Sequence, residues 1–346
     1  SGLGENMKEA ITLVESLLAD AQANPAALQG LKADILKRRQ NNKLNQNANF
    51  SQLRGYNTYG PHSPSTNILT NNEIKGLKDN ALLDRIHALN SYEHEILYYG
   101  PMTQEEIVAT IAELHNVPEK LTPVVKNDSF KERKITKNEV IIAPYDAKQI
   151  YYLQYSNNEE KLDVANDPYI NLYNEYFGNG MNCIVFQEMR EARALAYSAL
   201  ARLLEPEFQG DSYKYFAFIA TQNDKMKTAI QAFDEIINDM PESETAFNIA
   251  KEALITTLRT QRITGHHILS SYMNTRELGL TEHRSKKMYE VLQTLTLEDI
   301  KATQKKWVED RTYHYGILGD IKDLDTKYLS TLGPVQTLTL EEIFGY

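Results

Sequence analysis

The chain carries an internal repeat with a period of 219 residues, which constrains the fold more than any other feature of the sequence. Residues Met7–Asp20 align without a gap with residues Met226–Asp239. Apolar residues fall at matching positions of the two segments: Ile11, Val14, Leu17 and Leu18 in the first, and Ile230, Phe233, Ile236 and Ile237 in the second. A repeat of this length indicates two duplicated domains and argues against a solenoid of short units.

The repeat extends past these two segments. Lys32 of the first copy matches Lys251 of the second, and Gly100 matches Gly319. Residues 138–225, which precede the second copy, are rich in the β-branched and aromatic residues typical of strands, and the first copy has no counterpart within the chain. We therefore expect the first unit to lack the front of its domain, and part of what the function needs to lie outside residues 1–346.

The composition is that of an ordinary soluble protein. Hydrophobic residues make up 42% of the 346 residues and charged residues 24%, and this length suffices for two domains. The net charge of −10 argues against nucleic-acid or anionic-membrane partners, which attract clustered Lys and Arg. Cys183 is the only cysteine, which excludes a disulfide framework and a thiolate metal cluster. No apolar run reaches the about 20 residues that a membrane-spanning helix needs.

The first third of the chain has mainly helical periodicity. The pattern predicts helices over 5–22 and 25–45, from about 71 to 91, and from 103 to 115. Asn24 and Pro25 stand where a helix cap and a first-turn proline belong, and Thr103 with Glu106 fits a capping box. Residues 94–99 are predicted to form a short strand. A long loop after the second helix is indicated by Gly55, Gly60, Pro61 and Pro64.

Beyond a charged, proline-containing stretch at 117–137, which we interpret as an inter-domain linker, the pattern changes to strands. Strands are predicted at 139–143, 149–155, 194–203, 213–220 and 313–318. Helices are predicted at 168–177, 183–191, 223–239, 243–261, 266–279, 282–293 and 297–307.

These elements predict an α+β fold in which a mostly antiparallel sheet carries a helical layer on one face. The unit is duplicated, and the first copy retains mainly its helical part. The predicted division is therefore a partial first unit at 1–116, the linker at 117–137 and a complete second unit at 138–346.

The segment 174–198 holds the densest set of candidate functional residues. Its Gly178-x-Gly180 lacks the third glycine of a dinucleotide-binding loop, so we interpret it as a helix-ending turn. Arg190 lies near the end of a predicted helix, and Tyr197 lies on the strand that follows. Taken singly, the first is typical of a solvated arginine and the second of a core or half-buried tyrosine. A strand that folds back after a helix can bring them together, and a guanidinium with a phenol can hydrogen-bond an extended peptide.

The sequence Phe186-Gln-Glu-Met-Arg-Glu-Ala-Arg-Ala-Leu-Ala-Tyr197 resembles the hallmark of one peptidase family. This is the C-terminal, non-catalytic half of the pitrilysin/insulinase family of zinc metallopeptidases, which includes the mitochondrial processing peptidase. The family's motif places an Arg seven residues before a Tyr, and Arg190 and Tyr197 match it. The resemblance covers residues 136–346, including Gly316–Asp320, and residues 5–100 as the rear part of the preceding unit.

The resemblance implies four homologous units in two halves that close around unfolded peptide. The first half would bind zinc through a His-x-x-Glu-His motif and a further Glu. The second half would hold the substrate backbone, and the resemblance assigns that substrate-binding role to Arg190 and Tyr197. It implies two partners, a catalytic peptidase half that is fused upstream or separate, and an unfolded peptide. The bacterial relatives point to the cell envelope or periplasm.

Zinc is expected in the missing catalytic half and not in this chain. No His-x-x-Glu-His occurs among the eight histidines, and we expect no catalytic residue, metal site or other cofactor here. The register of the family's zinc helix on 168–178 places Tyr169, Leu172 and Tyr173 at the ligand and base positions. None of these side chains can replace His or Glu as a zinc ligand or base.

We therefore expect the substrate-binding, non-catalytic half of a zinc metallopeptidase that degrades or processes peptides, inactive without the zinc-bearing half. The alternative is a non-proteolytic structural or peptide-binding homologue of the same fold, as in the core subunits of a respiratory complex that the fold resembles. The intact pair of Arg190 and Tyr197 favours the peptidase, because a scaffold has no evident need for it.

Overall fold

A computed structural model describes residues 2–125 and 130–346, which form two compact units. Unit 1 comprises Ser1–Asn41, Leu69–Ser129 and Ile263–Tyr272, and unit 2 comprises Asn42–Ile68, Phe130–Arg262 and Met273–Tyr346. The predicted linker at 117–137 includes residues 126–129, which lie outside the described residues. The predicted domain boundaries follow the repeat in the sequence, whereas the two compact units are defined by contacts between residues. The predicted boundaries therefore stay a prediction.

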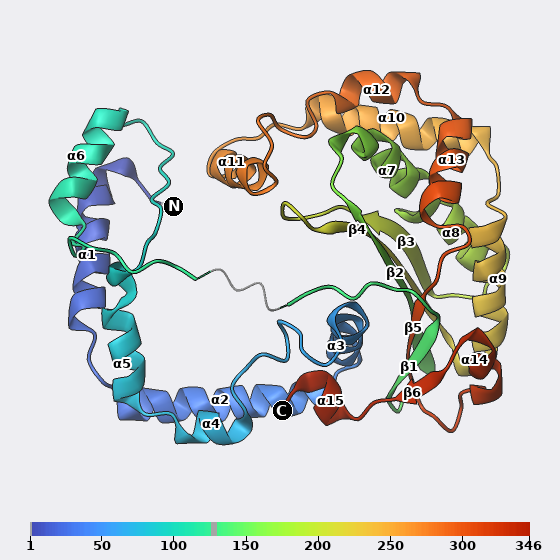
Figure 1. The fold of residues 1–346 in the computed structure, drawn as a ribbon, viewed down its shortest axis with the longest axis horizontal. Helices are drawn as coiled ribbons and strands as arrows, with labels where there is room; N and C mark the ends of the chain where they lie inside the picture. Colours follow the sequence, from blue (N-terminus) through green and yellow to red (C-terminus); the bar gives the residue numbers. More distant parts are fainter. Residues whose placement is uncertain (1, 126–129) are drawn as a thin grey trace. The chain divides into compact units, whose positions relative to one another are not determined.

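Unit 2 is built on a six-stranded sheet with the strand order β3-β4-β2-β5-β1-β6 (Figure 1). β2 pairs antiparallel with β4 and β5, and β3 pairs antiparallel with β4, whereas β1 pairs parallel with β5 and β6. The predicted α+β fold is confirmed. The strands are β1 Glu139–Pro144, β2 Gln149–Lys161, β3 Ser198–Leu204, β4 Ser212–Gln222, β5 His314–Gly319 and β6 Val335–Thr337.

A layer of helices covers one face of this sheet (Figure 1). In α9 the apolar residues recur at helical spacing and turn one stripe toward the sheet. Phe233 and its stripe neighbours Ile230, Ile236 and Ile237 are at most 2% exposed, and they join Tyr152 of β2 in the main core. The helices of this layer are α7 Asp167–Tyr173, α8 Ile184–Phe186, α9 Met226–Asn238, α10 Glu244–Thr260, α12 Met288–Thr294, α13 Leu297–Trp307 and α14 Thr326–Leu332.

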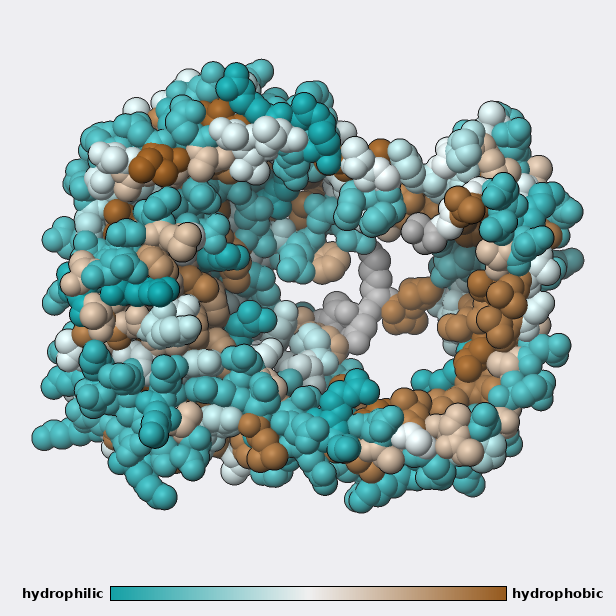
Figure 2. All heavy atoms as spheres, turned by 180° about the vertical axis from the view of Figure 1, so that it is seen from behind, coloured by the Kyte–Doolittle hydropathy of each residue, from teal (hydrophilic) through white to brown (hydrophobic). Residues whose placement is uncertain are grey.

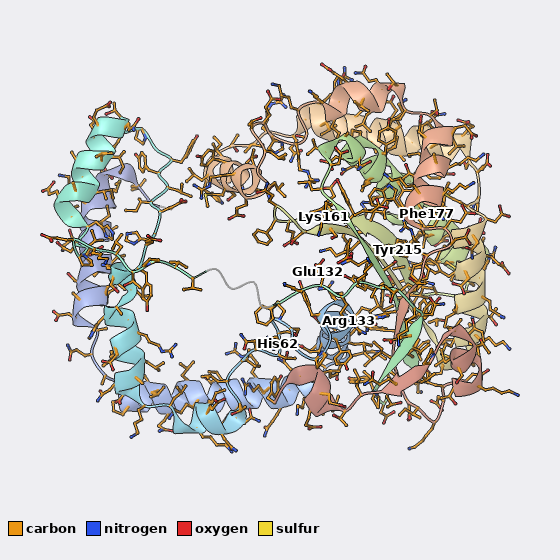
Figure 3. All side chains as sticks on the ribbon, viewed as in Figure 1. His62, Glu132, Arg133, Lys161, Phe177 and Tyr215 are labelled. Atoms are coloured by element: carbon orange, nitrogen blue, oxygen red, sulfur yellow. The ribbon has the colours of Figure 1, made fainter. Side chains whose placement is uncertain are left out.

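The opposite face is covered by α3 (Gln46–Tyr59), by α15 (Leu340–Phe344) and by the extended segment 130–135. Successive strand residues point to opposite faces, and Ile141 and Ala143 pack with Leu53 of α3 here, whereas Val140 and Ile142 belong to the main core. Figure 3 shows the segment around Glu132 and Arg133 beside α3. Ion pairs fix this segment: Glu132 to Lys214 of β4 at 2.6 Å, and Arg133 to Glu139 of β1 at 3.1 Å.

The helix α3 corrects the predicted loop around Gly55. The Asn45 side chain caps the helix by accepting from the Ala48 N–H at 2.9 Å, and Gly60, with φ of 83°, ends it. Few apolar residues mark the segment, so its periodicity is weak. Burial of Leu53 against the sheet outweighs the modest helix propensity of the asparagines and Gly55. The elements α14, β6 and α15 were also not predicted.

Unit 1 is helical, and the predicted caps at Asn24 and Thr103 are confirmed, whereas the helix expected to be capped by Asn71 or Asn72 is capped by Thr70. Asn24 accepts from the Ala27 N–H at 2.9 Å, and Thr103 forms a capping box with Glu106. The single helix predicted from 71 to 91 is two helices, separated at Leu77–Lys78. The helices are α1 Met7–Asp20, α2 Pro25–Lys43, α4 Asn71–Gly76, α5 Asp79–His87 and α6 Gln104–Leu114, and the unit also includes the first part of α11 His267–Glu277.

The strand predicted at 94–99 does not form. The β-pairing in the described part of unit 1 is one isolated bridge, between Tyr92 and Thr122. The repeat counterpart of 94–99 is 313–318, which is nearly all β5, and β5 is held by β1 and β2. Because the described residues of unit 1 offer no such neighbouring strands, the same pattern stays irregular here.

The helices follow the repeat throughout. Each helix of the first copy has a counterpart displaced by the same period, and the pairs are α1 with α9, α2 with α10, α3 with α11, α4 with α12, α5 with α13 and α6 with α14. The duplication seen in the sequence is therefore a duplication of a set of six helices.

Candidate functional site

The predicted site residues Arg190 and Tyr197 lie on the turn between α8 and β3, the strand at one edge of the sheet. Arg190 belongs to a π-helical stretch, Gln187–Ala192, that continues α8. Ala194 then takes a left-handed backbone, with φ of 48°, and β3 begins at Ser198. π-Helical turns and left-handed non-glycine residues are uncommon, and both concentrate at functional sites.

The structure brings Arg190 and Tyr197 together. The guanidinium carbon of Arg190 lies 5.7 Å from the ring centroid of Tyr197 and 5.0 Å from that of Phe186. Its nearest ion-pair partner is Glu191, at 3.5 Å. The Arg190 side chain is 46% exposed and Tyr197 is 70% exposed. The expected juxtaposition is therefore present, held by cation–π contacts at the surface.

The expectation of Tyr197 as a core or half-buried strand residue is wrong. Tyr197 precedes β3 by one residue, and its N–H donates to the Ala220 carbonyl of β4. Ala199 and Ala201, on the same strand, are buried. Tyr197 thus stands just before the regular strand, and its ring is exposed to solvent.

Arg193, three residues after Arg190, has a structural role. It forms ion pairs with Glu235 of α9 at 2.8 Å and with Glu188 at 3.4 Å. The hydrogen bond that Arg193 donates to Glu235 raises the pKa of Arg193 above the ordinary value. Arg190 and Arg193 therefore differ in kind: Arg193 ties the turn to α9, and Arg190 presents its guanidinium to solvent.

The outer edge of β3 is partly closed by the π-helical turn Asn174–Gly178. The Asn174 side chain both donates to the Leu203 carbonyl at 2.9 Å and accepts from the Leu203 N–H at 2.8 Å. A Cβ on Gly178 would lie 1.8 Å from the Ala201 carbonyl oxygen, so only glycine allows this approach. Gly180, with φ of 91°, ends the turn as predicted. A further strand could therefore not pair with β3 at Ala201–Leu203.

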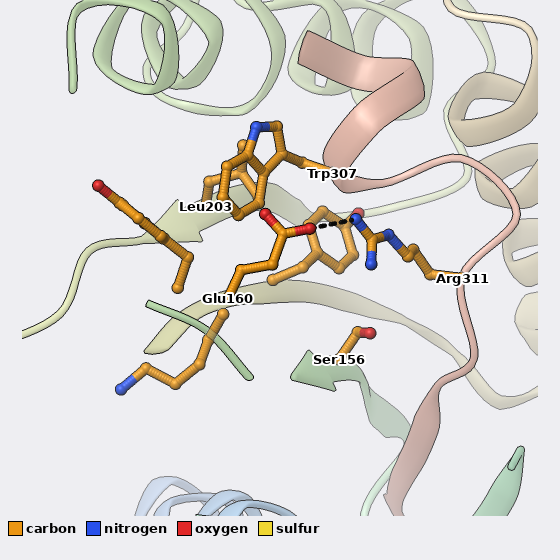
Figure 4. Close-up of a pocket in the computed structure, with 8 residues that line it drawn as sticks. Ser156, Glu160, Leu203, Trp307 and Arg311 are labelled. Atoms are coloured by element: carbon orange, nitrogen blue, oxygen red, sulfur yellow. Dashed lines mark hydrogen bonds and ion pairs between the residues drawn. The ribbon is translucent and has the colours of Figure 1, made fainter. Parts of the chain in front are cut away.

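The hollows of unit 2 were not predicted from the sequence. The one in Figure 4 lies beside Trp307 and holds the ion pair of Glu160 and Arg311 at 3.5 Å. Its volume of about 10 Å³ has room for a single water at most.

The second hollow has a volume of about 480 Å³ and is lined by Tyr169, Arg284 and Lys287, among others. Arg284 is largely buried, with its side chain 15% exposed. It donates two hydrogen bonds, each 2.8 Å long, to Asp167, which is 0% exposed, and pairs with Glu205 at 3.1 Å. This bidentate pair anchors the start of α7, and no sequence spacing reveals it.

The described residues contain no group of three or more His, Cys, Asp or Glu side chains that could hold a metal ion. At the positions aligned with the family's zinc helix, Leu172 and Tyr173 are 0% exposed within the core, and the Tyr173 hydroxyl donates to Gln304. The zinc of the family therefore does not fit these residues. No helix among the described residues is long and apolar enough to cross a membrane.

Comparison with known families agrees with this architecture. The family model described as the peptidase M16 inactive domain matches residues 94–254, a range that contains Arg190, Tyr197 and the sheet strands β1 to β4. No curated protein matches the sequence.

Solved structures share the fold. A peptidase M16 inactive domain from Pseudomonas fluorescens matches with a TM-score of 0.65 and 15% identity, over 92% of this chain and 76% of that chain. The ferredoxin protease FusC, solved in complex with Arabidopsis ferredoxin, matches with a TM-score of 0.67 and 14% identity, over 91% of this chain and 34% of that chain. The periplasmic protease PqqL from Escherichia coli matches with a TM-score of 0.64 and 13% identity, over 91% and 35%.

The chain thus spans about three quarters of the first of these structures and about a third of the two proteases. The family match and the fold together confirm the resemblance to the pitrilysin/insulinase metallopeptidases. Residues 94–254 thus match the inactive domain of M16 peptidases, and the chain is similar in fold to solved structures that include this domain.

Proposed function

We propose that the chain is the substrate-binding, non-catalytic half of a zinc metallopeptidase, and that Arg190 and Tyr197 hold the backbone of an unfolded peptide. The observation that carries the proposal is the exposed stack of Arg190 on Tyr197 and Phe186, with ring centroids at 5.7 and 5.0 Å. The proposed partners are the peptide and a catalytic half that bears the zinc.

The stack leaves the hydrogen-bonding groups of Arg190 available. Cation–π contact uses the flat face of the guanidinium, whereas its N–H groups point outward in the plane. Two parallel N–H groups fit a carboxylate or the carbonyl oxygens of an extended peptide. The aromatic rings therefore orient the guanidinium without engaging its N–H groups. The Tyr197 hydroxyl adds a further hydrogen-bond donor at the same place.

The side chains of this half would act by positioning. They would bind backbone carbonyls of the peptide and fix its register, which lowers the entropic cost of reaching a reactive geometry. We assign the zinc to the other half, since the described residues here do not fit it. The partial closure of β3 by Asn174 favours this side-chain mode over strand addition along that edge.

The related proteases support a substrate class and a location for the proposed function. FusC is described as a ferredoxin protease and PqqL as a periplasmic protease. By similarity to them, we propose that the substrate of this chain is a polypeptide and that the chain is located in the bacterial cell envelope.

A binding experiment tests the proposed role without the catalytic half. Fluorescence anisotropy would measure the Kd of a labelled, unstructured peptide for the chain. We expect Arg190→Ala to raise this Kd about tenfold or more, because a charge-assisted hydrogen bond contributes roughly 1.5–3 kcal/mol. Tyr197→Phe should raise it about fivefold, because a neutral hydrogen bond contributes roughly 1 kcal/mol. Matched controls are Arg193→Ala, in the same turn, and Tyr99→Phe, an exposed tyrosine of unit 1.

An unchanged Kd in both site variants would overturn the assigned roles. Reconstitution with the native zinc-bearing half then separates the two functional classes. Peptide hydrolysis by the pair, lowered in Arg190→Ala, supports the peptidase. Peptide binding with no hydrolysis would favour a non-proteolytic homologue.

A further inference from the structure

Two histidines of unit 1 meet end to end. The Nε2 atoms of His94 and His115 lie 2.7 Å apart, and the centroids of the two rings lie 4.9 Å apart. His94 is exposed on the segment between α5 and α6, and His115 caps the C-terminal end of α6, with its side chain 16% exposed. The separation of the two nitrogens is that of a hydrogen bond, which needs one N–H donor and one acceptor.

The other nitrogen of each ring is already a donor. Nδ1 of His94 lies 2.7 Å from the carbonyl oxygen of Tyr92, which can only accept. Nδ1 of His115 lies 2.7 Å from Oε1 of Glu15 in α1, and Oε2 of the same carboxylate accepts from the Asn90 side chain at 3.0 Å. Burial raises the pKa of Glu15, but the hydrogen bonds that it accepts together outweigh burial and hold the pKa below its ordinary value. The carboxylate therefore accepts, and both Nδ1 atoms carry a proton.

Two neutral rings cannot form the contact between the Nε2 atoms. A neutral imidazole carries one proton, and in each of these rings that proton is on Nδ1. Two unshared electron pairs would then face each other. With a proton on each Nε2, two imidazolium ions would face each other without an acceptor. The contact therefore requires one additional proton, held between the two rings.

We propose that His94 and His115 share one proton and thereby form a pH-sensitive link that holds the segment 91–94 to α1 and α6. Because the pair titrates as a coupled unit, the link is strongest at an intermediate pH and weakens on either side. Loss of the shared proton leaves two electron pairs in contact, and gain of a second proton places two positive charges in contact. The link is separate from Arg190 and Tyr197, which belong to unit 2.

Glu15 is the counter-charge of the pair. It contacts His115 directly, and an opposite charge at this distance favours the protonated form of the pair. Other charged side chains on the elements around the pair are Lys8 and Glu113, which pair with each other at 2.9 Å, Glu93 and Glu95 beside His94, and Glu119 and Lys120 before Thr122.

Polar contacts matter for α1 because burial holds it only weakly. α1 contains no buried residue, and its apolar residues Val14 and Leu17 are 53% and 60% exposed. Figure 2 shows apolar side chains gathered over the helices of unit 1, on the right of the view. Hydrogen bonds such as that between Glu15 and His115 therefore supply a large share of the attachment of α1 to its neighbours.

The backbone beside His94 supplies two local reporters of the link. The Glu93 N–H donates to the Thr122 carbonyl at 2.9 Å, and the Thr122 N–H donates to the Ser91 carbonyl at 2.7 Å. These amides are protected from exchange only while the segment 91–94 stays in place. Their protection therefore measures the strength of the link.

Amide hydrogen exchange measured by NMR over a range of pH tests the proposal. Each rate is expressed as protection relative to an unstructured amide at the same pH. In the chain 1–346, protection of the Glu93 and Thr122 amides should pass through a maximum between about pH 5 and 8, where histidines titrate, and fall about fivefold on each side. His94→Phe keeps a ring without Nε2 and should abolish the maximum. His87→Phe, at an exposed histidine of α5, is the matched control and should retain it.

A flat pH profile in the parent chain, or an unchanged maximum in His94→Phe, would overturn the proposal. Glu15→Gln separates an electrostatic role from a structural one. Loss of the counter-charge should move the maximum to lower pH, whereas a merely structural contact would lower the protection without moving the maximum.

Nitrogen-15 NMR of the histidine rings reads the proton positions directly. We expect both Nδ1 atoms to be protonated and one proton to be shared by the two Nε2 atoms at the pH of maximal protection. An unprotonated Nδ1 in either ring would contradict the shared proton. Titration with Zn²⁺ tests the competing occupant, a metal ion. If Zn²⁺ shifts both Nε2 resonances and removes the pH maximum, the pair is a metal site and the proposal is overturned.

Discussion

Lys32 and Lys251 perform the same task in the two copies of the repeat. The Lys251 ammonium donates to the carbonyls of Gln293 and Leu295, at 2.9 and 2.8 Å, where α12 ends. The Lys32 ammonium donates to the carbonyls of Lys75 and Leu77, where α4 ends. A cation at this place satisfies the orphan carbonyls and interacts favourably with the helix dipole. The duplication therefore extends to a lysine that hydrogen-bonds backbone carbonyls at the end of a neighbouring helix.

The first prediction concerns this pair. Replacing Lys251 with Met keeps the aliphatic stem but leaves two carbonyls without their donor, which should cost about 1–3 kcal/mol of stability. Lys32→Met should act in the same way on unit 1. Local hydrogen exchange would read both effects, with faster exchange at the end of α12 in the first variant and of α4 in the second. Exchange that is unchanged at both helix ends would contradict the shared role.

Replacing Arg190 with Lys tests whether the planar stack matters, beyond the charge. Lysine keeps the positive charge but cannot place two parallel N–H groups over the rings of Phe186 and Tyr197. We expect peptide affinity to fall by roughly 1–2 kcal/mol, measured as the Kd in the anisotropy experiment. Arg193→Lys, in the ion-paired position, should leave the Kd unchanged. A Kd for Arg190→Lys equal to that of the parent chain would show that charge alone suffices.

Gly178→Ala should destabilise unit 2 strongly. The added Cβ would lie 1.8 Å from the Ala201 carbonyl oxygen, and backbone atoms on both sides cannot move aside cheaply. The expected cost is about 3 kcal/mol or more. Gly180→Ala is the comparison, since it meets no atom within 4 Å and is strained only by its φ of 91°. It should cost about 1 kcal/mol. Denaturant unfolding of the two variants would check this order, and a smaller loss for Gly178→Ala would refute it.

The pH dependence of stability should reflect two opposed groups in unit 2. Burial raises the pKa of Asp234 to about 6, from a model-peptide value of 3.8, despite a hydrogen bond from Gln154. Burial lowers the pKa of His314 to about 4 from 6.5. The raised carboxyl pKa means that folding binds a proton, so this contribution to stability falls as pH rises from about 4 to 6. The lowered His pKa means that folding releases a proton, so that contribution rises between about 4 and 6.5.

Asp234→Asn removes the first of these groups. The variant should be more stable than the parent at pH 7, by up to about 3 kcal/mol, because no buried carboxylate remains to be charged. Its stability should also fall more steeply on acidification below pH 6.5, since the effect of His314 is no longer opposed. Urea unfolding between pH 4.5 and 7 measures both. A parallel pair of pH profiles for parent and variant would be inconsistent with the raised pKa of Asp234.

The local determinants of the fold could be predicted with good accuracy. Helix periodicity and capping residues such as Asn24 and Thr103 act within a few residues of the chain, so the sequence reports them directly. α3 was missed because what stabilises it is the burial of Leu53 on a sheet far along the chain. The bidentate contact between Asp167 and Arg284 was missed for the same reason, because the two residues are distant in sequence.

For the candidate site, too, local features could be predicted and contacts between distant residues could not. The sequence by itself determined the repeat and the α+β class, and its resemblance to a family motif singled out Arg190 and Tyr197. Only the tertiary structure decided that Tyr197 faces solvent, that Arg193 and not Arg190 is tied to α9, and that α1 leaves its apolar stripe exposed. A periodic pattern records which side chains seek burial, whereas their actual surroundings depend on which distant surface is present to cover them. For 94–99 and 313–318, corresponding segments of the repeat, the presence or absence of neighbouring strands alone separates an irregular segment from a central strand.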